Sequence, residues 1–202
     1  MMTIHGMTDS GNCYKPRLLM ALLGLPFRHV EVSFLDGGTR QPAFTAKNPN
    51  AKVPLLELED GRVLAESNAI LCYLADGTSY MPLDRYERAV ALQWMFFEQY
   101  SHEPHVAVRR SLMRYERLAD QATPARMQTL LEQGNKALSV METRLAGTPF
   151  LAGTAPSVAD IALFAYTHCA EEGGFVLEDF RAVSAWLDRV RSLPGFRPML
   201  PD

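Results

Sequence analysis

The feature that most constrains the fold of this chain is a hairpin signal followed at once by a helix signal. Asp60 and Gly61 separate two apolar runs, residues 53–59 and 62–65. An Asp-Gly pair between two such runs is the strongest short-range indication of a β-hairpin. Residues 67–75 then carry apolar side chains at helical spacing. The sequence therefore predicts two antiparallel strands and a helix that packs on them.

The residues before this hairpin predict two more strands and one more helix. Residues 3–7 and 27–33 have the length and composition of short strands. Between them, residues 14–23 carry a wide apolar stripe, and Gly24 follows as a helix C-cap. The predicted order is β-α-β, a linking segment, then β-β-α. Such an order forms a mixed four-stranded sheet with helices packed on it.

The pattern changes in the second part of the chain, where no convincing strand run occurs. Helical spacing is found in residues 84–117, 124–145, 158–171 and 180–193. Pro104 should kink or divide the first of these stretches, and Ser157 with Asp160 forms a capping-box-like start to the third. We therefore predict an α/β domain over residues 1–78 and an all-helical domain over residues 84–202.

The composition excludes several classes of function. The chain is 48% hydrophobic and 21% charged, as is typical of globular proteins. Its net charge of −3 argues against binding nucleic acid through a basic face. No apolar stretch reaches the ~20 residues of a membrane span, and the N-terminus lacks the pattern of a signal peptide. The three cysteines show no CxxC spacing and no disulfide framework, so we expect a reducing cytoplasm.

The start of the helix predicted at residues 67–75 has the chemistry of a binding site. Glu66 and Ser67 stand beside the first N–H groups of that helix, which have no partners within it. These N–H groups and the positive end of the helix dipole favour a carboxylate. Glu66 favours an ammonium, so a ligand with both charges at one end, an α-amino acid group, fits the pair. Ser67 as a simple N-cap is the structural alternative.

Three motifs in a fixed order identify a family resemblance. They are the loop at residues 10–14 (Ser-Gly-Asn-Cys-Tyr), Val53-Pro54 before a strand, and the run at residues 64–70 (Leu-Ala-Glu-Ser-Asn-Ala-Ile). With the α/β-then-helical layout, the whole chain resembles the soluble glutathione transferase superfamily, in particular its bacterial serine-type (theta/nu-like) members. The resemblance implies a thioredoxin-like N-terminal domain, a C-terminal helical bundle, a homodimer, and glutathione as co-substrate.

The resemblance also implies a role for each residue of the glutathione site. Glu66 would hold the ammonium of the γ-glutamyl group, and Ser67 with the helix N-terminus would hold its carboxylate. The peptide bond before Pro54 would be cis, which turns the Val53 backbone outward to pair with the cysteinyl part as a short added strand. Lys52 would meet the glycyl carboxylate.

Two residues compete as hydrogen-bond donor to the glutathione sulfur. Ser10 occupies the position of the donor in serine-type relatives and is the first choice. Asn12 is the second choice, because some bacterial and fungal relatives place an asparagine near the sulfur, although it also suits a helix cap. One donor and a nearby helix N-terminus would lower the thiol pKa from about 8.5 to roughly 6.5–7.5. Cys13 could instead form a mixed disulfide with glutathione, but we expect its side chain to be turned into the packing of the helix against its neighbours.

The helical domain is expected to supply the pocket for the second substrate. The resemblance places the helix that carries Phe97, Tyr100, His105 and Arg109 beside the thiol, so these side chains are candidates for the electrophile site. We predict no metal site, because Pro104 disrupts the helix around the nearby histidine pair and no further ligand has suitable spacing.

The predicted function is conjugation of the glutathione thiolate to an apolar electrophile. Two alternatives share the same fold. One is a glutathione-dependent disulfide or peroxide reductase, and the other is a non-enzymatic interaction module.

Overall fold

The chain folds into two compact units. The computed structural model describes residues 1–200. The first unit comprises Met1–Asp76 together with the chain from Leu193 onward, and the second comprises Gly77–Ser192. The predicted domains, residues 1–78 and 84–202, differ from these units in two respects: the boundary falls between Asp76 and Gly77, and the contacts group the last segment with the first unit.

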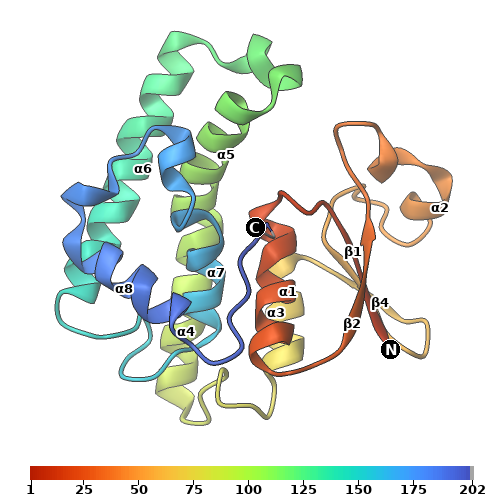
Figure 1. The fold of residues 1–202 in the computed structure, drawn as a ribbon, viewed down its shortest axis with the longest axis horizontal. Coiled ribbons are helices and arrows are strands. Elements are labelled where there is room, and N and C mark those ends of the chain that lie inside the picture. The colour runs from red at the N-terminus through yellow and green to blue at the C-terminus, as the bar shows by residue number, and fades with distance from the viewer. Residues whose placement is uncertain (201–202) are drawn as a thin grey trace. The chain divides into compact units, whose positions relative to one another are not determined.

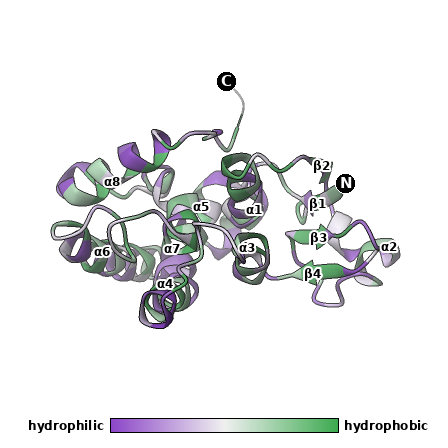
Figure 2. Cartoon of the chain, turned by 90° about the horizontal axis from the view of Figure 1, so that it is seen from below, coloured by the Kyte–Doolittle hydropathy of each residue, from purple (hydrophilic) through white to green (hydrophobic). Residues whose placement is uncertain are grey.

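A mixed four-stranded sheet forms the centre of the first unit, as predicted. Its strands are β1 (Met2–Gly6), β2 (Phe27–Glu31), β3 (Leu55–Glu57) and β4 (Val63–Ala65). Their order across the sheet is β2-β1-β3-β4, which can be followed in Figure 2. Strand β1 is parallel to β2, while β3 is antiparallel to both β1 and β4. The parallel pair needs a crossover connection, and the first helix supplies it.

Helices cover both faces of this sheet. Helices α1 (Gly11–Leu22) and α3 (Ser67–Ala75) lie on one face, and the short α2 (Pro42–Thr45) lies on the other (Figures 1 and 2). A 3₁₀ turn, Gly38–Arg40, precedes α2. After α1, Gly24 follows the C-cap residue Leu23 and has a left-handed conformation with φ 65°, so the helix stops at Gly24 as predicted.

The chain returns to the first unit at its C-terminal end and packs on α1. The hydroxyl of Tyr14 donates a hydrogen bond to the Arg197 carbonyl. Arg17 donates from Nη2 to the Met199 carbonyl at 3.4 Å. Gly195 has φ 86°, and a Cβ at this position would lie 2.8 Å from the Ala21 carbonyl oxygen. Only glycine allows so close an approach in this conformation.

The second unit is helical in its described residues. Its α-helices are α4 (Arg85–Phe97), α5 (Glu103–Arg114), α6 (Pro124–Leu145), α7 (Val158–Thr167) and α8 (Arg181–Arg191), with 3₁₀ turns at Glu116–Gln121, Ala170–Gly173 and Leu177–Asp179. A π-helical turn, Glu98–His102, separates α4 from α5. Pro104 follows in the first turn of α5, so it divides the first predicted helix as expected.

Helix α7 is buried along its whole length, and a capping box begins it as predicted. Asp160 is fully buried. Its Oδ2 accepts hydrogen bonds from the Ser157 N–H at 2.9 Å and the Ser157 hydroxyl at 3.1 Å. Its Oδ1 accepts from the Leu151 N–H and from Trp186 Nε1, both at 2.9 Å. Burial raises the pKa of Asp160, and these hydrogen bonds act against that rise.

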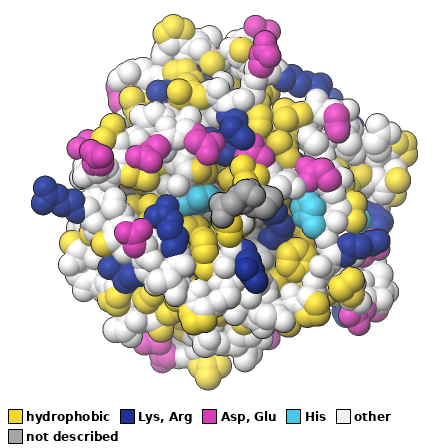
Figure 3. All heavy atoms as spheres, viewed as in Figure 1, with side chains coloured by type: hydrophobic (Ala, Val, Ile, Leu, Met, Phe, Trp, Pro, Cys, Tyr) yellow, Lys and Arg dark blue, Asp and Glu magenta, His cyan; other side chains and the backbone are white. Residues whose placement is uncertain are grey.

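Charged side chains of both signs share the surface with apolar groups. On the face drawn in Figure 3, Lys and Arg side chains are interspersed with Asp and Glu. This mixture agrees with the small net charge of −3. Within residues 1–200, no helix combines the length and the apolar character that a membrane span requires.

Candidate functional site

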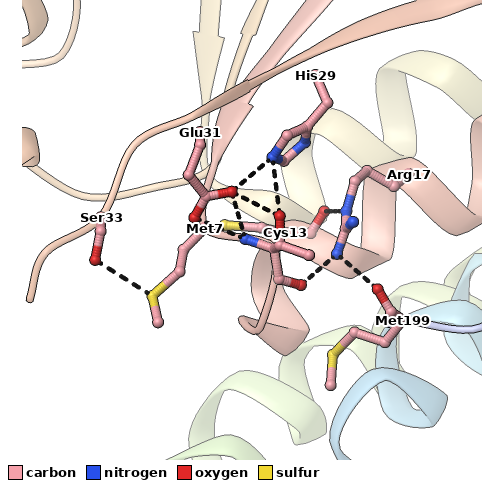
Figure 4. Close-up of polar contacts among 8 residues, drawn as sticks. Met7, Cys13, Arg17, His29, Glu31, Ser33 and Met199 are labelled. Atoms are coloured by element: carbon pink, nitrogen blue, oxygen red, sulfur yellow. Dashed lines mark hydrogen bonds and ion pairs between the residues drawn. The ribbon is translucent and has the colours of Figure 1, made fainter. Parts of the chain in front are cut away.

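The loop between β1 and α1 is held in place by a glutamate on β2. The Thr8 N–H lies 3.1 and 3.0 Å from Oε1 and Oε2 of the Glu31 carboxylate, and the Thr8 hydroxyl donates to Oε2 at 2.6 Å. His29 lies 3.1 Å from the same oxygen (Figure 4). Arg17 donates to the Thr8 carbonyl at 2.6 Å. Burial raises the pKa of Glu31, but the hydrogen bonds from Thr8 and His29 outweigh burial and lower it. Glu31 therefore positions the residues that lead to Ser10.

Replacing Glu31 by glutamine should destabilise the first unit by about 1 kcal/mol, because the carboxylate is half exposed and its hydrogen bonds are partly screened. The pKa of Glu31 is lowered in the folded chain, so its stabilisation is complete above the unfolded value of 4.5 and is lost as the pH falls through the folded value. The difference in unfolding free energy between wild type and Glu31→Gln should therefore vanish in acid.

Denaturant unfolding at pH 7 and at successively lower pH measures this difference. Glu59→Gln is the matched control, because Glu59 lies in a surface ion pair and its side chain is 72% exposed. A difference that persists unchanged below the folded pKa of Glu31 would contradict the assigned role.

Ser10 is the N-cap of α1. Its backbone is extended, with φ −103°, and its Oγ accepts a hydrogen bond from the Cys13 N–H at 3.4 Å. This bond uses a lone pair of the hydroxyl oxygen and does not consume the O–H, although the Ser10 side chain is also hydrogen-bonded to the Cys13 thiol and acts against the rise in the pKa of that thiol. The capping role and a role as hydrogen-bond donor to a ligand are therefore compatible.

Cys13 is packed inside the first unit, as expected from the sequence. Its side chain is fully buried. Burial raises the pKa of the Cys13 thiol to about 11. A thiol with such a pKa is almost entirely protonated at neutral pH, and the protonated form is a poor nucleophile.

The loop before β3 is shaped by Asn48, whose side chain is buried. Asn48 donates from Nδ2 to the Lys52 carbonyl at 2.7 Å and accepts from the Asn50 N–H at 3.1 Å. The Val53–Pro54 peptide bond is cis, which confirms the prediction made for it. The Lys52 side chain is exposed.

The N-terminus of α3 brings together two of the predicted site residues. Ser67 is only 5% exposed, and its hydroxyl donates to Asn12 Oδ1 at 3.2 Å. Glu66 precedes it as the N-cap residue, is exposed, and has φ 68°. A non-glycine residue at such a φ costs about 1–3 kcal/mol and is found where the surroundings impose it, often at functional sites.

Lys15 is a residue of this site that sequence reasoning missed. Its side chain is fully buried. Its Nζ donates to Ser67 Oγ and to Asn68 Oδ1, both at 3.2 Å. The available signal was a lysine on the same helical face as the apolar Leu18 and Leu22. A lysine is almost never buried unless it is paired, so this position calls for a polar partner in the fold.

The surroundings of Gly6 and one hydrogen bond bring the three predicted segments together. A Cβ at Gly6, on β1, would lie 2.8 Å from Cys13 Sγ and 3.9 Å from Pro54 Cα. The loop at Ser10, the loop at Val53–Pro54 and, through Asn12, the start of α3 therefore meet at one end of the sheet. Together they offer a carboxylate, a helix N-terminus with a hydroxyl, and a second hydroxyl in a loop. These groups can hold an ammonium, a carboxylate and a thiolate.

In the second unit, three of the four candidate electrophile residues line one cavity. Phe97, Tyr100 and His105 line a cavity of about 350 Å³, to which residues of α6 also contribute. Arg109 has a structural role in the same unit, because it donates to the Gly173 and Met127 carbonyls, each at 2.6 Å. The assignment of an electrophile site remains a prediction.

The sheet, its helices and the helical second unit define a class: thioredoxin-like proteins with an all-helical C-terminal unit. Family models for the glutathione S-transferase N-terminal and C-terminal domains match residues 9–76 and 96–194. The chain therefore belongs to the glutathione S-transferase family.

Individual relatives agree with this family. A crystal structure of a glutathione S-transferase from Pseudomonas fluorescens is 50% identical, covers 99% of both chains and superposes with a TM-score of 0.96. A glutathione transferase from Burkholderia graminis, solved with two glutathione molecules per subunit, is 28% identical with a TM-score of 0.83, over 96% of this chain and 85% of that one. The disulfide-bond oxidoreductase YfcG of Escherichia coli is 29% identical over 91% of this chain and 87% of its own length.

Proposed function

We propose that this protein is a glutathione transferase that conjugates the glutathione thiolate to an apolar electrophile. The observation that carries the proposal is the start of α3, where the exposed Glu66 stands beside Ser67 and the Ser67 hydroxyl is bonded to Asn12. We also propose that the protein is cytoplasmic, forms a homodimer and is of the bacterial serine type (theta/nu-like). Membership of the family supports these proposals.

Glutathione would bind through its charged ends and its peptide backbone. Glu66 takes the γ-glutamyl ammonium, and Ser67 takes the adjacent carboxylate through its hydroxyl and the N–H groups that begin α3. The Val53 backbone pairs with the cysteinyl part as an added strand. Lys52 reaches the glycyl carboxylate.

Ser10 would stabilise the thiolate. The Ser10 hydroxyl donates to the sulfur, which favours the ionised form and lowers the thiol pKa. The thiol proton passes to solvent, and the sulfur then uses an electron pair to form a bond to the electrophilic carbon. The leaving group departs with the electron pair of the bond that breaks. Asn12 is the second candidate for the donor.

A second candidate function is glutathione-dependent disulfide reduction. The name of the E. coli relative favours it. In this reaction the same glutathione thiolate attacks one sulfur of a disulfide, and the other sulfur leaves as a thiolate. Because Cys13 is buried and its pKa is raised to about 11, the attacking thiolate would come from glutathione.

Replacing Glu66 by glutamine should raise the dissociation constant of glutathione about 10-fold or more, because the ammonium loses a charged partner. Isothermal calorimetry measures the constant directly. Glu59→Gln, which changes a surface carboxylate in the same unit, should leave the dissociation constant of glutathione unchanged.

A wild-type protein that binds no glutathione at millimolar concentration would overturn the proposal and favour an interaction module. Turnover of a mixed disulfide without turnover of a halogenated aromatic would favour the reductase.

A further inference from the structure

We propose that Lys15 is a positioning residue that makes the start of α3 selective for a carboxylate. The inference rests on the proposed glutathione site, and it assigns to Lys15 a role in choosing the chemistry of the ligand at Ser67. Lys15 lies in the second turn of α1, and its ammonium reaches the first turn of α3. The contact therefore joins two helices at the binding end of the sheet.

The first argument concerns the direction of hydrogen bonds at Ser67. An ammonium has three donors and no acceptor, so Lys15 occupies a lone pair of Ser67 Oγ. The Ser67 proton must then point to a different acceptor. In this structure that acceptor is Asn12 Oδ1, at 3.2 Å. Lys15 thus holds the Ser67 hydroxyl as a donor, and a ligand group that replaces Asn12 there must accept.

The second argument concerns charge. Lys15 is fully buried, so water screens its charge much less than it screens an exposed lysine. The ammonium lies beside the N-terminus of α3, where the helix dipole is also positive. Both charges act in the same direction, and an anion gains more from them than a neutral acceptor does. The preferred acceptor is therefore a carboxylate.

The third argument concerns geometry. Lys15 also donates to Asn68 Oδ1 at 3.2 Å. By donating hydrogen bonds to two consecutive side chains, Lys15 fixes the first turn of α3 against α1. Lys15 itself is buried and makes no contact with the ligand in this proposal. Its effect passes through Ser67 and through its charge.

The experiment compares two ligands that differ only in the carboxylate. Glutathione carries it, and 4-aminobutyryl-cysteinyl-glycine lacks it but keeps the ammonium. Wild type should bind glutathione more tightly than this analogue. Lys15→Met keeps an unbranched side chain of similar length but removes the charge. It should raise the dissociation constant of glutathione about 10- to 100-fold and that of the analogue less than about threefold. If Lys15 had a purely structural role, its replacement would weaken the binding of both ligands equally.

Two further variants make the comparison secure. Lys47→Met removes a half-exposed lysine that pairs with Glu57 in the same unit, and it should change neither constant. Lys15→Gln keeps a polar side chain without the charge, and it gives the same comparison if the methionine variant fails to fold. Equal weakening of both ligands, no weakening, or equal binding of both by wild type would overturn the inference. Wild type that binds neither ligand would overturn the proposed function itself.

Discussion

Replacing Asp160 by alanine is expected to lower the free energy of unfolding of the helical unit by about 3–5 kcal/mol. The Asp160 carboxylate accepts hydrogen bonds from two backbone N–H groups, the Ser157 hydroxyl and the Trp186 indole. Ser157, Trp186 and Leu151 are all buried, so water cannot replace the lost acceptor. Each donor left without a partner costs about 1–3 kcal/mol, although relaxation reduces the sum.

Denaturant unfolding followed by tryptophan fluorescence tests this prediction. Both tryptophans of the chain, Trp94 and Trp186, belong to the helical unit and report on it. The midpoint should fall while the dependence on denaturant stays constant. Asp188→Ala is the matched control, since this aspartate on α8 has a side chain that is 77% exposed, and its loss should cost less than about 0.5 kcal/mol. A loss below about 1 kcal/mol for Asp160→Ala would contradict the prediction.

Replacing Ser10 by glycine is expected to raise the pKa of the bound glutathione thiol by about 1–2 units, because a hydrogen bond to a charged sulfur is worth about 1.5–3 kcal/mol. The rise in conjugation rate with pH should move to higher pH by the same amount. At neutral pH the rate should fall about 10-fold or more, while at high pH the two proteins should converge. The affinity for glutathione should change little.

The choice of glycine separates the two roles of Ser10. Glycine is nearly as good an N-cap as serine, so α1 should lose only a few tenths of a kcal/mol. Ser10→Thr keeps the hydroxyl and should keep the pH profile of the wild type. Asn12→Ala tests the second candidate. If Asn12→Ala moves the profile and Ser10→Gly does not, then Asn12 is the principal donor and the assignment to Ser10 is wrong.

Helix boundaries were predictable where local signals mark both ends. The helices predicted at residues 67–75 and 124–145 coincide with α3 and α6. The first follows a hairpin and a serine, while the second starts at Thr123-Pro124 and ends near Gly147. Each boundary is set by turn or capping residues adjacent in sequence, so tertiary contacts were not needed to find it.

Other features depend on contacts between distant residues, and the sequence did not predict them. Lys15 and Ser67 are separated by 52 positions, and only the packing of α1 against α3 brings them together. The sequence pattern places residues 84–202 in one helical domain, yet the segment from Leu193 contacts α1. Periodicity describes one element at a time, so it carries no information on which elements meet.

The return of the C-terminal segment to α1 has a consequence for recombination. The sheet unit is built from both extremities of the polypeptide, and the helical unit is inserted between them. A single crossover near position 78 between two homologous genes would therefore give a chimera in which Tyr14 and Arg17 come from one parent and the C-terminal segment that they contact comes from the other. Exchange of intact modules requires two crossovers, one on either side of the helical insert.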